Sequence, residues 1–188
     1  MAESKWLLFI YQVPASPSTH RSYVWRKLKA SGALYLQNSI CLLPASAALK
    51  TALDELRAEI LSRGGEAQLL PIEILDGEEN GSIVARFEAQ MDDEYGEFLE
   101  QCGEFHAELA KERAKRHLTF GELEENDVDL NKLKSWLPKL YARDFFAVGL
   151  RAKAASELQD CERDFALFER EVEGASLGED GAAMEPER

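Results

Sequence analysis

The first 76 residues carry hydrophobic patterns that predict strands and helices in turn. The run at 6–13 is rich in aromatic and branched apolar residues, and Pro14 ends it, which is typical of a buried strand. In residues 20–30, Val24 and Leu28 share one helical face while basic side chains occupy the other side. We therefore predict a buried strand followed by an amphipathic helix.

The next stretch, residues 34–43, is apolar on both sides of a polar break, so it fits either one bent strand or two short strands. Leucines at helical spacing then predict a helix over residues 46–63. Residues 68–75 return to a strand pattern, in which Pro71 indicates an edge strand or a bulge. This order, β-α-β-β-α-β, predicts an α+β ferredoxin-like unit over residues 1–76, with another small α/β sandwich as the alternative.

Beyond residue 82 the hydrophobic residues recur at steps of three, four or seven, which predicts one long helix or two in series over residues 82–116. Two later stripes, at 130–140 and 158–172, predict further amphipathic helices. We thus predict a mostly antiparallel helical bundle over residues 82–173. A polar linker at 77–81 precedes it, and a disordered acidic tail at 174–188 follows it.

Charge is unevenly distributed along the chain. Of its 188 residues, 45% are hydrophobic and 30% are charged, as in globular proteins, and the net charge is −13. Residues 1–50 hold six lysines or arginines against one acid, a net of +5, so the other 138 residues carry −18. The average charge repels nucleic acid and anionic membranes, so the N-terminal third is the part that can contact a polyanion.

The helix predicted at 20–30 contains basic residues and no acid. Such a helix can lie along phosphates, with Tyr23 or Trp25 supporting base or sugar contacts. The alternative is a solvated face, or a face that pairs with acidic helices of this chain or of a partner. The candidate nucleic-acid-binding residues are Arg21, Arg26, Lys27 and Lys29, with Arg143 and Arg151 as additions from the second half.

Other residue groups give weaker chemical signals. Cys41, Cys102 and Cys161 lie far apart in the sequence, which predicts buried free thiols in a reducing compartment rather than disulfides. Cys102 and His106 are four residues apart on one helical face and offer a metal site together with Cys161, although core positions are the simpler interpretation. The acid clusters at 92–94 and 124–127 fit a solvated surface.

No catalytic motif occurs in the chain, so we expect no enzymatic activity, no cofactor and no bound metal. The N-terminal apolar run is too short to cross a bilayer and lacks the layout of a signal peptide. We therefore expect a cytoplasmic protein that does not bind membranes.

Four segments carry a family resemblance: WLLFIYQVP at 6–14, VWRKLK at 24–29, GALYLQ at 32–37 and RDFF at 143–146. Together with Ser39 and Cys41, they resemble the N-terminal domain of the chromate resistance protein ChrB, over about residues 5 to 173. The resemblance implies a cytoplasmic regulator of bacterial chromate resistance, which binds promoter DNA and releases it when chromate is present. Full-length members carry a further C-terminal domain associated with chromate sensing, so we expect no complete effector switch within this chain.

The opening strand, helix and strand also resemble, more distantly, Cas2-type nucleases and PaaX-type repressors. The nucleases have an aspartate at the end of the first strand to hold a metal, where this sequence has Gln12. An amide cannot replace a carboxylate in holding a divalent cation and orienting an attacking water, so we expect no metal-dependent nuclease activity.

These observations lead to one main hypothesis and two alternatives. We predict a non-enzymatic regulatory protein that binds double-stranded DNA in the transcriptional control of chromate resistance. The first alternative is an interaction module, in which the helical half or a sheet edge forms a homodimer or docks a partner and the basic helix only balances acidic neighbours. The remote alternative is a metal-dependent hydrolase that uses the acid clusters or Cys102 with His106.

Overall fold

The computed structural model describes residues 5–14, 16, 18–74 and 76–182, which form four strands and five helices. The chain divides into two compact units, one from residues 1–90 and 142–147 and the other from residues 91–141 and 148–188. The first unit contains the sheet and helices α1 and α2, and the second is helical. Helix α3 (Gly77–Lys115) contributes to both units. The protein is therefore α+β, as the sequence predicted.

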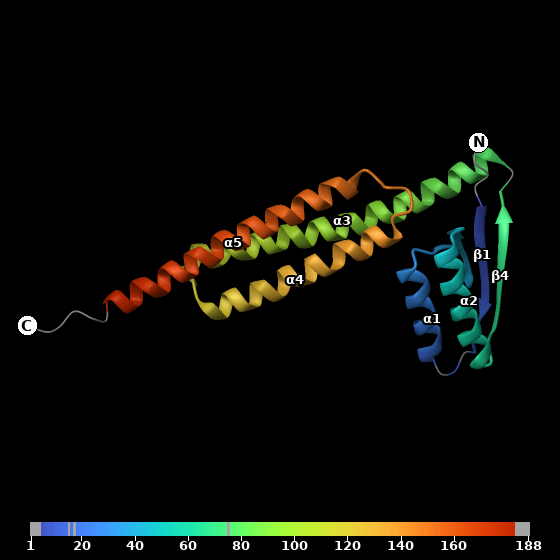
Figure 1. Ribbon diagram of the computed structural model, residues 1–188, viewed down its shortest axis with the longest axis horizontal. Coiled ribbons are helices and arrows are strands. Elements are labelled where there is room, and N and C mark those ends of the chain that lie inside the picture. The colour runs from blue at the N-terminus through green and yellow to red at the C-terminus, as the bar shows by residue number, and fades with distance from the viewer. Residues whose placement is uncertain (1–4, 15, 17, 75, 183–188) are drawn as a thin grey trace, which may run out of the picture. The chain divides into compact units, whose positions relative to one another are not determined.

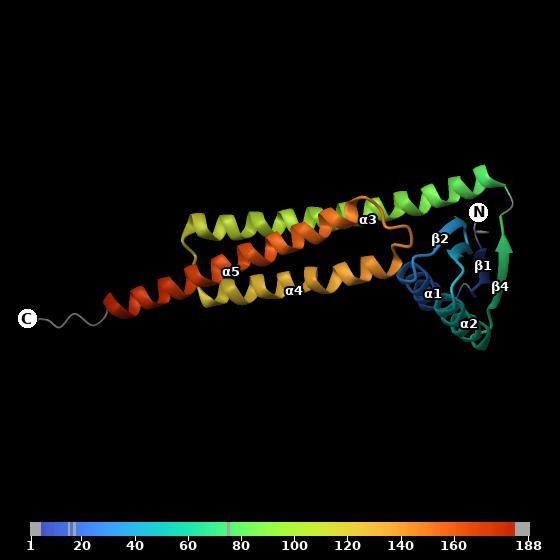
Figure 2. The ribbon, with the colours of Figure 1, turned by 45° about the horizontal axis from the view of Figure 1, so that its top comes forward.

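The strands of the first unit form an antiparallel sheet in the order β2-β3-β1-β4 (Figures 1 and 2). They are β1 (Lys5–Gln12), β2 (Leu34–Gln37), β3 (Ile40–Pro44) and β4 (Glu66–Glu73). The stretch at 34–43 is thus a hairpin of two short strands, with Ser39 at a φ of 64° in its turn. Pro71 lies in the edge strand β4, where a missing N–H disturbs the sheet least, and the edge prediction is confirmed.

Helices α1 (Ser18–Ala30) and α2 (Ala47–Ser62) cover one face of this sheet (Figures 1 and 2). The side chain of Ser46 accepts a hydrogen bond from the backbone N–H of Leu49 at 3.2 Å, which caps the start of α2. The core between the helices and the sheet contains Leu7, Phe9, Val24, Leu28, Cys41, Leu43, Leu53, Leu56 and Ile60. The apolar stripes read from the sequence therefore face this core.

Part of the opposite sheet face is covered by the start of α3 and by the segment 142–147. The ring of Phe87 stacks on that of Trp6 with centroids 5.5 Å apart, and Phe146 contacts both rings. Gly32, at a φ of 75°, lies so close to this segment that a Cβ there would be 2.8 Å from the Cβ of Arg143. The sheet is thus packed on both faces, although unequally.

Residues 77–81, predicted as a linker, form the first turns of α3 instead. The carboxylate of Asp76 accepts hydrogen bonds from the backbone N–H groups of Glu78 and Glu79, at 2.8 and 3.0 Å. An aspartate in this place caps a helix and also favours its positive end. The polar, glycine-containing composition was therefore the signature of a helix start.

In the second unit α3, α4 (Phe120–Arg143) and α5 (Leu150–Ala182) lie side by side (Figures 1 and 2). Their fully buried core residues include Tyr95, Phe98, Cys102, Leu109, Leu140, Cys161, Phe168 and Val172. Residues 174–182, predicted as part of the disordered tail, are the last turns of α5, and 183–188 lie outside the described residues. In the described part of the chain, none of the helices has the length and apolar character that a membrane span requires.

Candidate nucleic-acid interface

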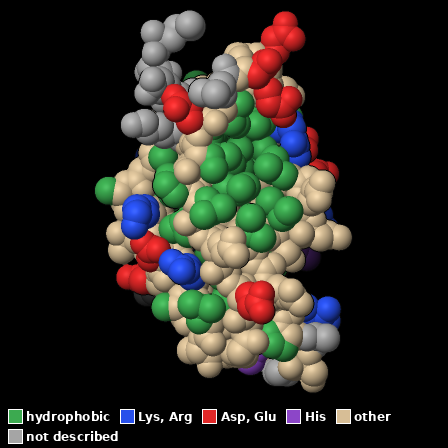
Figure 3. Space-filling model, turned by 90° about the vertical axis from the view of Figure 1, so that its right-hand side faces the viewer, with side chains coloured by type: hydrophobic (Ala, Val, Ile, Leu, Met, Phe, Trp, Pro, Cys, Tyr) green, Lys and Arg blue, Asp and Glu red, His purple; other side chains and the backbone are tan. Residues whose placement is uncertain are grey.

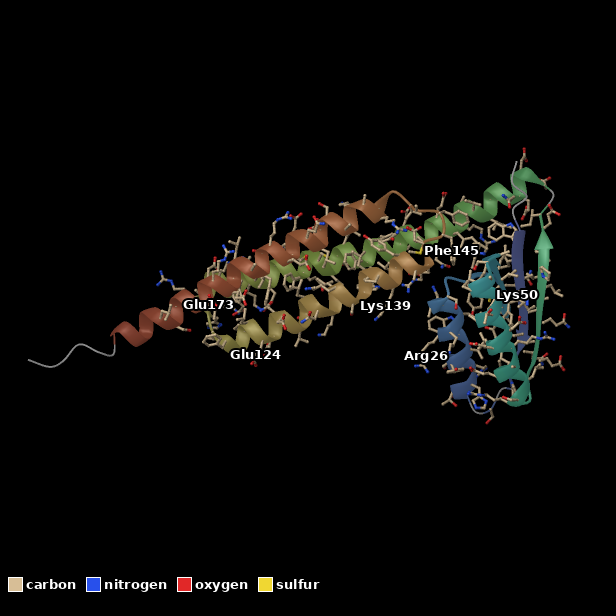
Figure 4. All side chains as sticks on the ribbon, in the orientation of Figure 1. Arg26, Lys50, Glu124, Lys139, Phe145 and Glu173 are labelled. Carbon is tan, nitrogen blue, oxygen red and sulfur yellow. The ribbon has the colours of Figure 1, made fainter. Side chains whose placement is uncertain are left out.

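The basic residues of helix α1 are distributed around the part of its surface that is not buried in the core. Val24 and Leu28 are 4% and 0% exposed and pack in the core of the first unit. Arg21, Arg26 and Lys27 are exposed and Lys29 is partly exposed. Figure 4 shows Arg26 projecting from α1 away from the sheet. The amphipathic pattern thus places four positive charges on one solvent-facing helix.

No carboxylate in the described part of the chain pairs with any of these four side chains. The Nε of Arg26 donates a hydrogen bond to the backbone carbonyl of Ser22 at 3.3 Å, and the Nζ of Lys27 lies 5.6 Å from the centre of the Tyr23 ring. Neither contact neutralises a charge. The positive charges of α1 are therefore available to an anionic partner.

An open hollow of about 680 Å³ lies beside α1 in the first unit. Its lining consists of Tyr11, Gln12, Val13, Arg21, Trp25, Tyr35, Gln37, Asn38 and Ser39. The indole of Trp25 is 50% exposed, and an exposed aromatic ring next to an arginine suits contact with a base or a sugar. The hollow therefore adds aromatic and polar groups to the basic helix.

The two tyrosines of this hollow are linked by a hydrogen bond between their hydroxyl groups, 3.2 Å apart. Burial raises the pKa of Tyr11 and, together with the Tyr11 hydrogen bond, that of Tyr35. Both phenols are therefore neutral at physiological pH and retain their protons. With Gln12, they present neutral hydrogen-bonding groups and no negative charge to a ligand in the hollow.

Arg143 and Arg151 are less available than the side chains of α1. Arg143 lies in the first unit, is partly buried and takes part in other interactions. Arg151 lies in the second unit, where its guanidinium stacks over the Tyr141 ring at 4.3 Å from the centroid. The structure thus gathers four of the six predicted residues on one helix, and gives both later arginines internal contacts.

Arg63 is a basic residue near α1 that the sequence did not single out. It caps the C-terminal end of α2, and its guanidinium lies 4.8 Å from the centre of the Tyr23 ring of α1. The side chain is exposed and has no carboxylate partner among the described residues. The Gly-Gly pair after Arg63 predicts the end of a helix there. It does not predict that Arg63 lies near α1, because that proximity depends on how the two helices pack.

The three cysteines are free and buried, as the sequence predicted. Burial raises the pKa of Cys41 to about 12, so this thiol is not reactive at neutral pH. In the second unit the Sγ of Cys161 lies 3.5 Å from the Nε2 of His106. Hydrogen bonding with Cys102 and burial raise the pKa of Cys161, which holds this thiol protonated.

The second ring nitrogen of His106 lies next to charged side chains. Its Nδ1 lies 2.8 Å from the Oδ2 of Asp164, and the Oδ1 of Asp164 accepts a hydrogen bond from Arg113 at 2.7 Å. Cys102, His106 and Cys161 therefore come together as the sequence suggested. They are not among the described groups of three whose ligand atoms all lie within 4.8 Å of one another, so the arrangement resembles a core network rather than a metal centre.

Fold and site together define a two-unit α+β protein with an uncompensated basic helix on its sheet unit. The chain belongs to the family described as "Protein ChrB, N-terminal", whose model matches residues 21–177 and so covers parts of both units. This family relates to chromate resistance. Protein ChrB from Cupriavidus metallidurans is 30% identical over 108 residues, which are 57% of this chain and 33% of that protein. The chain thus matches a third of the length of this relative.

Proposed function

We propose that this chain is a non-enzymatic regulatory protein of chromate resistance that binds double-stranded DNA through α1. The observation that carries the proposal is the basic face of α1, which lacks acidic partners among the described residues in a chain of net charge −13. We classify the sheet unit as ferredoxin-like, because each helix connects two strands that are separated by β1 or β3 in the sheet.

The contacts that we propose are mainly with phosphates. Arg21, Arg26, Lys27 and Lys29 span less than three turns of one helix, which is a small footprint for sequence-specific recognition. Trp25 and the hollow beside it would accept a base edge or a sugar. Affinity therefore arises chiefly from charge neutralisation, and specificity requires either the hollow or a second binding surface.

The test is a fluorescence anisotropy titration of a labelled duplex at low salt. The variant Arg26→Glu with Lys29→Glu is expected to weaken binding strongly, because it replaces two phosphate contacts by repulsion. The matched control is Lys139→Glu with Lys153→Glu, which changes the net charge equally at two exposed lysines of the second unit. Equal binding by both variants, or no binding at low salt by the unaltered chain, would refute the proposal.

A second candidate function is self-association through the outer face of the sheet. The register places Leu70, Leu8, Leu42 and Leu34 in one row across the four strands. Only part of this face is covered, since Leu70 is 41% exposed. Figure 3, which views the molecule from this side, shows hydrophobic side chains gathered in a continuous group. Such a face suits a second protein surface.

Light scattering over a range of protein concentrations tests this candidate. Leu70→Asp is expected to abolish a dimer, because it places a charge at the exposed end of the apolar row, on the edge strand β4. Leu61→Asp is the control, since Leu61 is 49% exposed on α2 and lies away from the sheet face. A chain that stays monomeric at every concentration would exclude the second candidate.

A further inference from the structure

Three potential metal ligands converge where α3 is joined to α4. They are Glu112 near the end of α3, His117 in the connecting segment and Glu122 in the first turn of α4. One ligand atom from each lies within 4.8 Å of the other two. We propose that these residues bind a divalent first-row transition ion such as Zn²⁺, independently of any DNA binding by α1.

The local fold brings these side chains together for identifiable reasons. Arg116 adopts a left-handed φ of 57°, and the backbone N–H of His117 then donates to the carbonyl of Glu112 at 3.0 Å. This turn ends α3 and folds His117 back over the preceding helical turn. Thr119 caps α4 by accepting a hydrogen bond from the N–H of Glu122 at 3.3 Å. The position of each ligand is thus determined by a helix end.

Glu112 is a buried carboxylate, only 2% exposed, which is uncommon for a glutamate. Its Oε1 lies 3.0 Å from the Nζ of Lys115 and 3.6 Å from that of Lys111. One carboxylate oxygen is therefore held by lysine, while the other faces His117.

The spacing on the His117 side suits an ion. The Oε2 of Glu112 lies 3.0 Å from the Nδ1 of His117. Two neighbouring ligands that each bind an ion at about 2.1 Å are separated by roughly 3.0 to 3.4 Å, so little movement is required. An imidazole with two carboxylates is a ligand set that zinc and manganese accept. Lys115 would remain on Oε1 as an outer-shell partner that orients the ligating carboxylate.

Solvent can reach this site, because the side chain of His117 is 57% exposed. Water would complete the coordination on that side. The bound ion would join the end of α3 to the start of α4, and we therefore infer a structural role in the second unit. The ligands differ from Cys102, His106 and Cys161, which do not form a group of three with ligand atoms within 4.8 Å of one another in the described part of the chain.

The test is equilibrium dialysis of the full chain against Zn²⁺, with Co²⁺ as a spectroscopic probe. We expect one ion per chain, with affinity reduced about tenfold or more in His117→Ala and in Glu122→Gln. The matched control, His20→Ala, removes a histidine of the first unit and is expected to bind normally. Glu112→Gln is less informative alone, because it also removes the buried ion pair with Lys115, so the two other variants decide.

Two results would overturn the inference. The first is no stoichiometric binding by the unaltered chain, or equal binding by His117→Ala and the unaltered chain. The second is a strong thiolate-to-cobalt absorption band, which would place the ion at the cysteines instead. A thermal shift on adding Zn²⁺ that is present in His20→Ala and absent in His117→Ala would support the site without any DNA measurement.

Discussion

The salt dependence of DNA binding can be worked out from the four charges of α1. Each phosphate that a protein neutralises on B-form DNA contributes about −0.9 to the slope of log K against log salt concentration. Four contacts by Arg21, Arg26, Lys27 and Lys29 predict a slope of about −3.6, so affinity falls about 150-fold between 50 and 200 mM salt. Reversing Arg26 and Lys29 leaves two contacts, a slope of about −1.8 and a fall of about 12-fold.

The assay is the same anisotropy titration, repeated at several NaCl concentrations for the unaltered chain and both double variants. Non-specific binding at physiological salt typically has a Kd of about 10⁻⁴ to 10⁻⁶ M, so the measurements begin at low salt. The Lys139 and Lys153 control keeps the full slope if only α1 contacts DNA. A reduced slope in that control, or an unchanged slope in the α1 variant, would refute the assignment of the phosphate contacts.

Three further predictions concern stability. Phe87→Ala removes a ring that is 2% exposed and is expected to destabilise the first unit by about 3–5 kcal/mol, measured by chemical denaturation. Gly32→Ala, at a φ of 75° with no room for a Cβ, is expected to cost more than about 1 kcal/mol in the same assay. Gly64→Ala has the same φ but open space, so it is expected to cost less than Gly32→Ala, and the difference measures the Cβ clash. His106→Gln is expected to lower the melting temperature more at pH 5.5 than at pH 8.5. Burial lowers the pKa of His106, but the hydrogen bond with Asp164 and nearby negative charges raise it more, so its stabilisation is present at low pH and is lost as pH rises through the raised pKa. An equal effect at both pH values would contradict this.

The sequence predicted the elements whose signals are local. The apolar run of β1, the two-sided pattern of α1 and the leucine repeat of α2 each appear in consecutive residues. The sequence did not decide between one bent strand and a hairpin at 34–44. The hairpin requires a left-handed φ at Ser39, which serine seldom adopts. The linker prediction at 77–81 was wrong because aspartate and glycine occur at the starts of helices as well as in loops, and here Asp76 caps α3.

The candidate sites divide in the same way. The basic face of α1 is visible in the sequence because one short helix carries it. Cys102 and His106 are also visible as a pair. Asp164, which contacts the His106 ring, lies 58 residues further along the chain, and its own contact with Arg113 spans 51 residues. Packing alone brings Arg63 to Tyr23. Sequence reasoning therefore found the charges on one element and suggested that Cys161 lies near Cys102 and His106, but it missed the contacts made by Asp164, Arg113 and Arg63.

The two candidate functions of the first unit are compatible, and one experiment relates them. A single α1 offers four phosphate contacts, whereas two copies paired through the outer sheet face would offer eight, with a slope of about −7.2. Leu70→Asp would then weaken DNA binding far more than Leu61→Asp, although both add the same negative charge. If α1 acts alone, the two variants bind DNA equally, and the measured slope stays near that of four contacts. The slope of the unaltered chain would therefore report how many copies bind together, because each copy brings one α1 of charge +4, while the rest of the chain carries −17 and on average repels DNA.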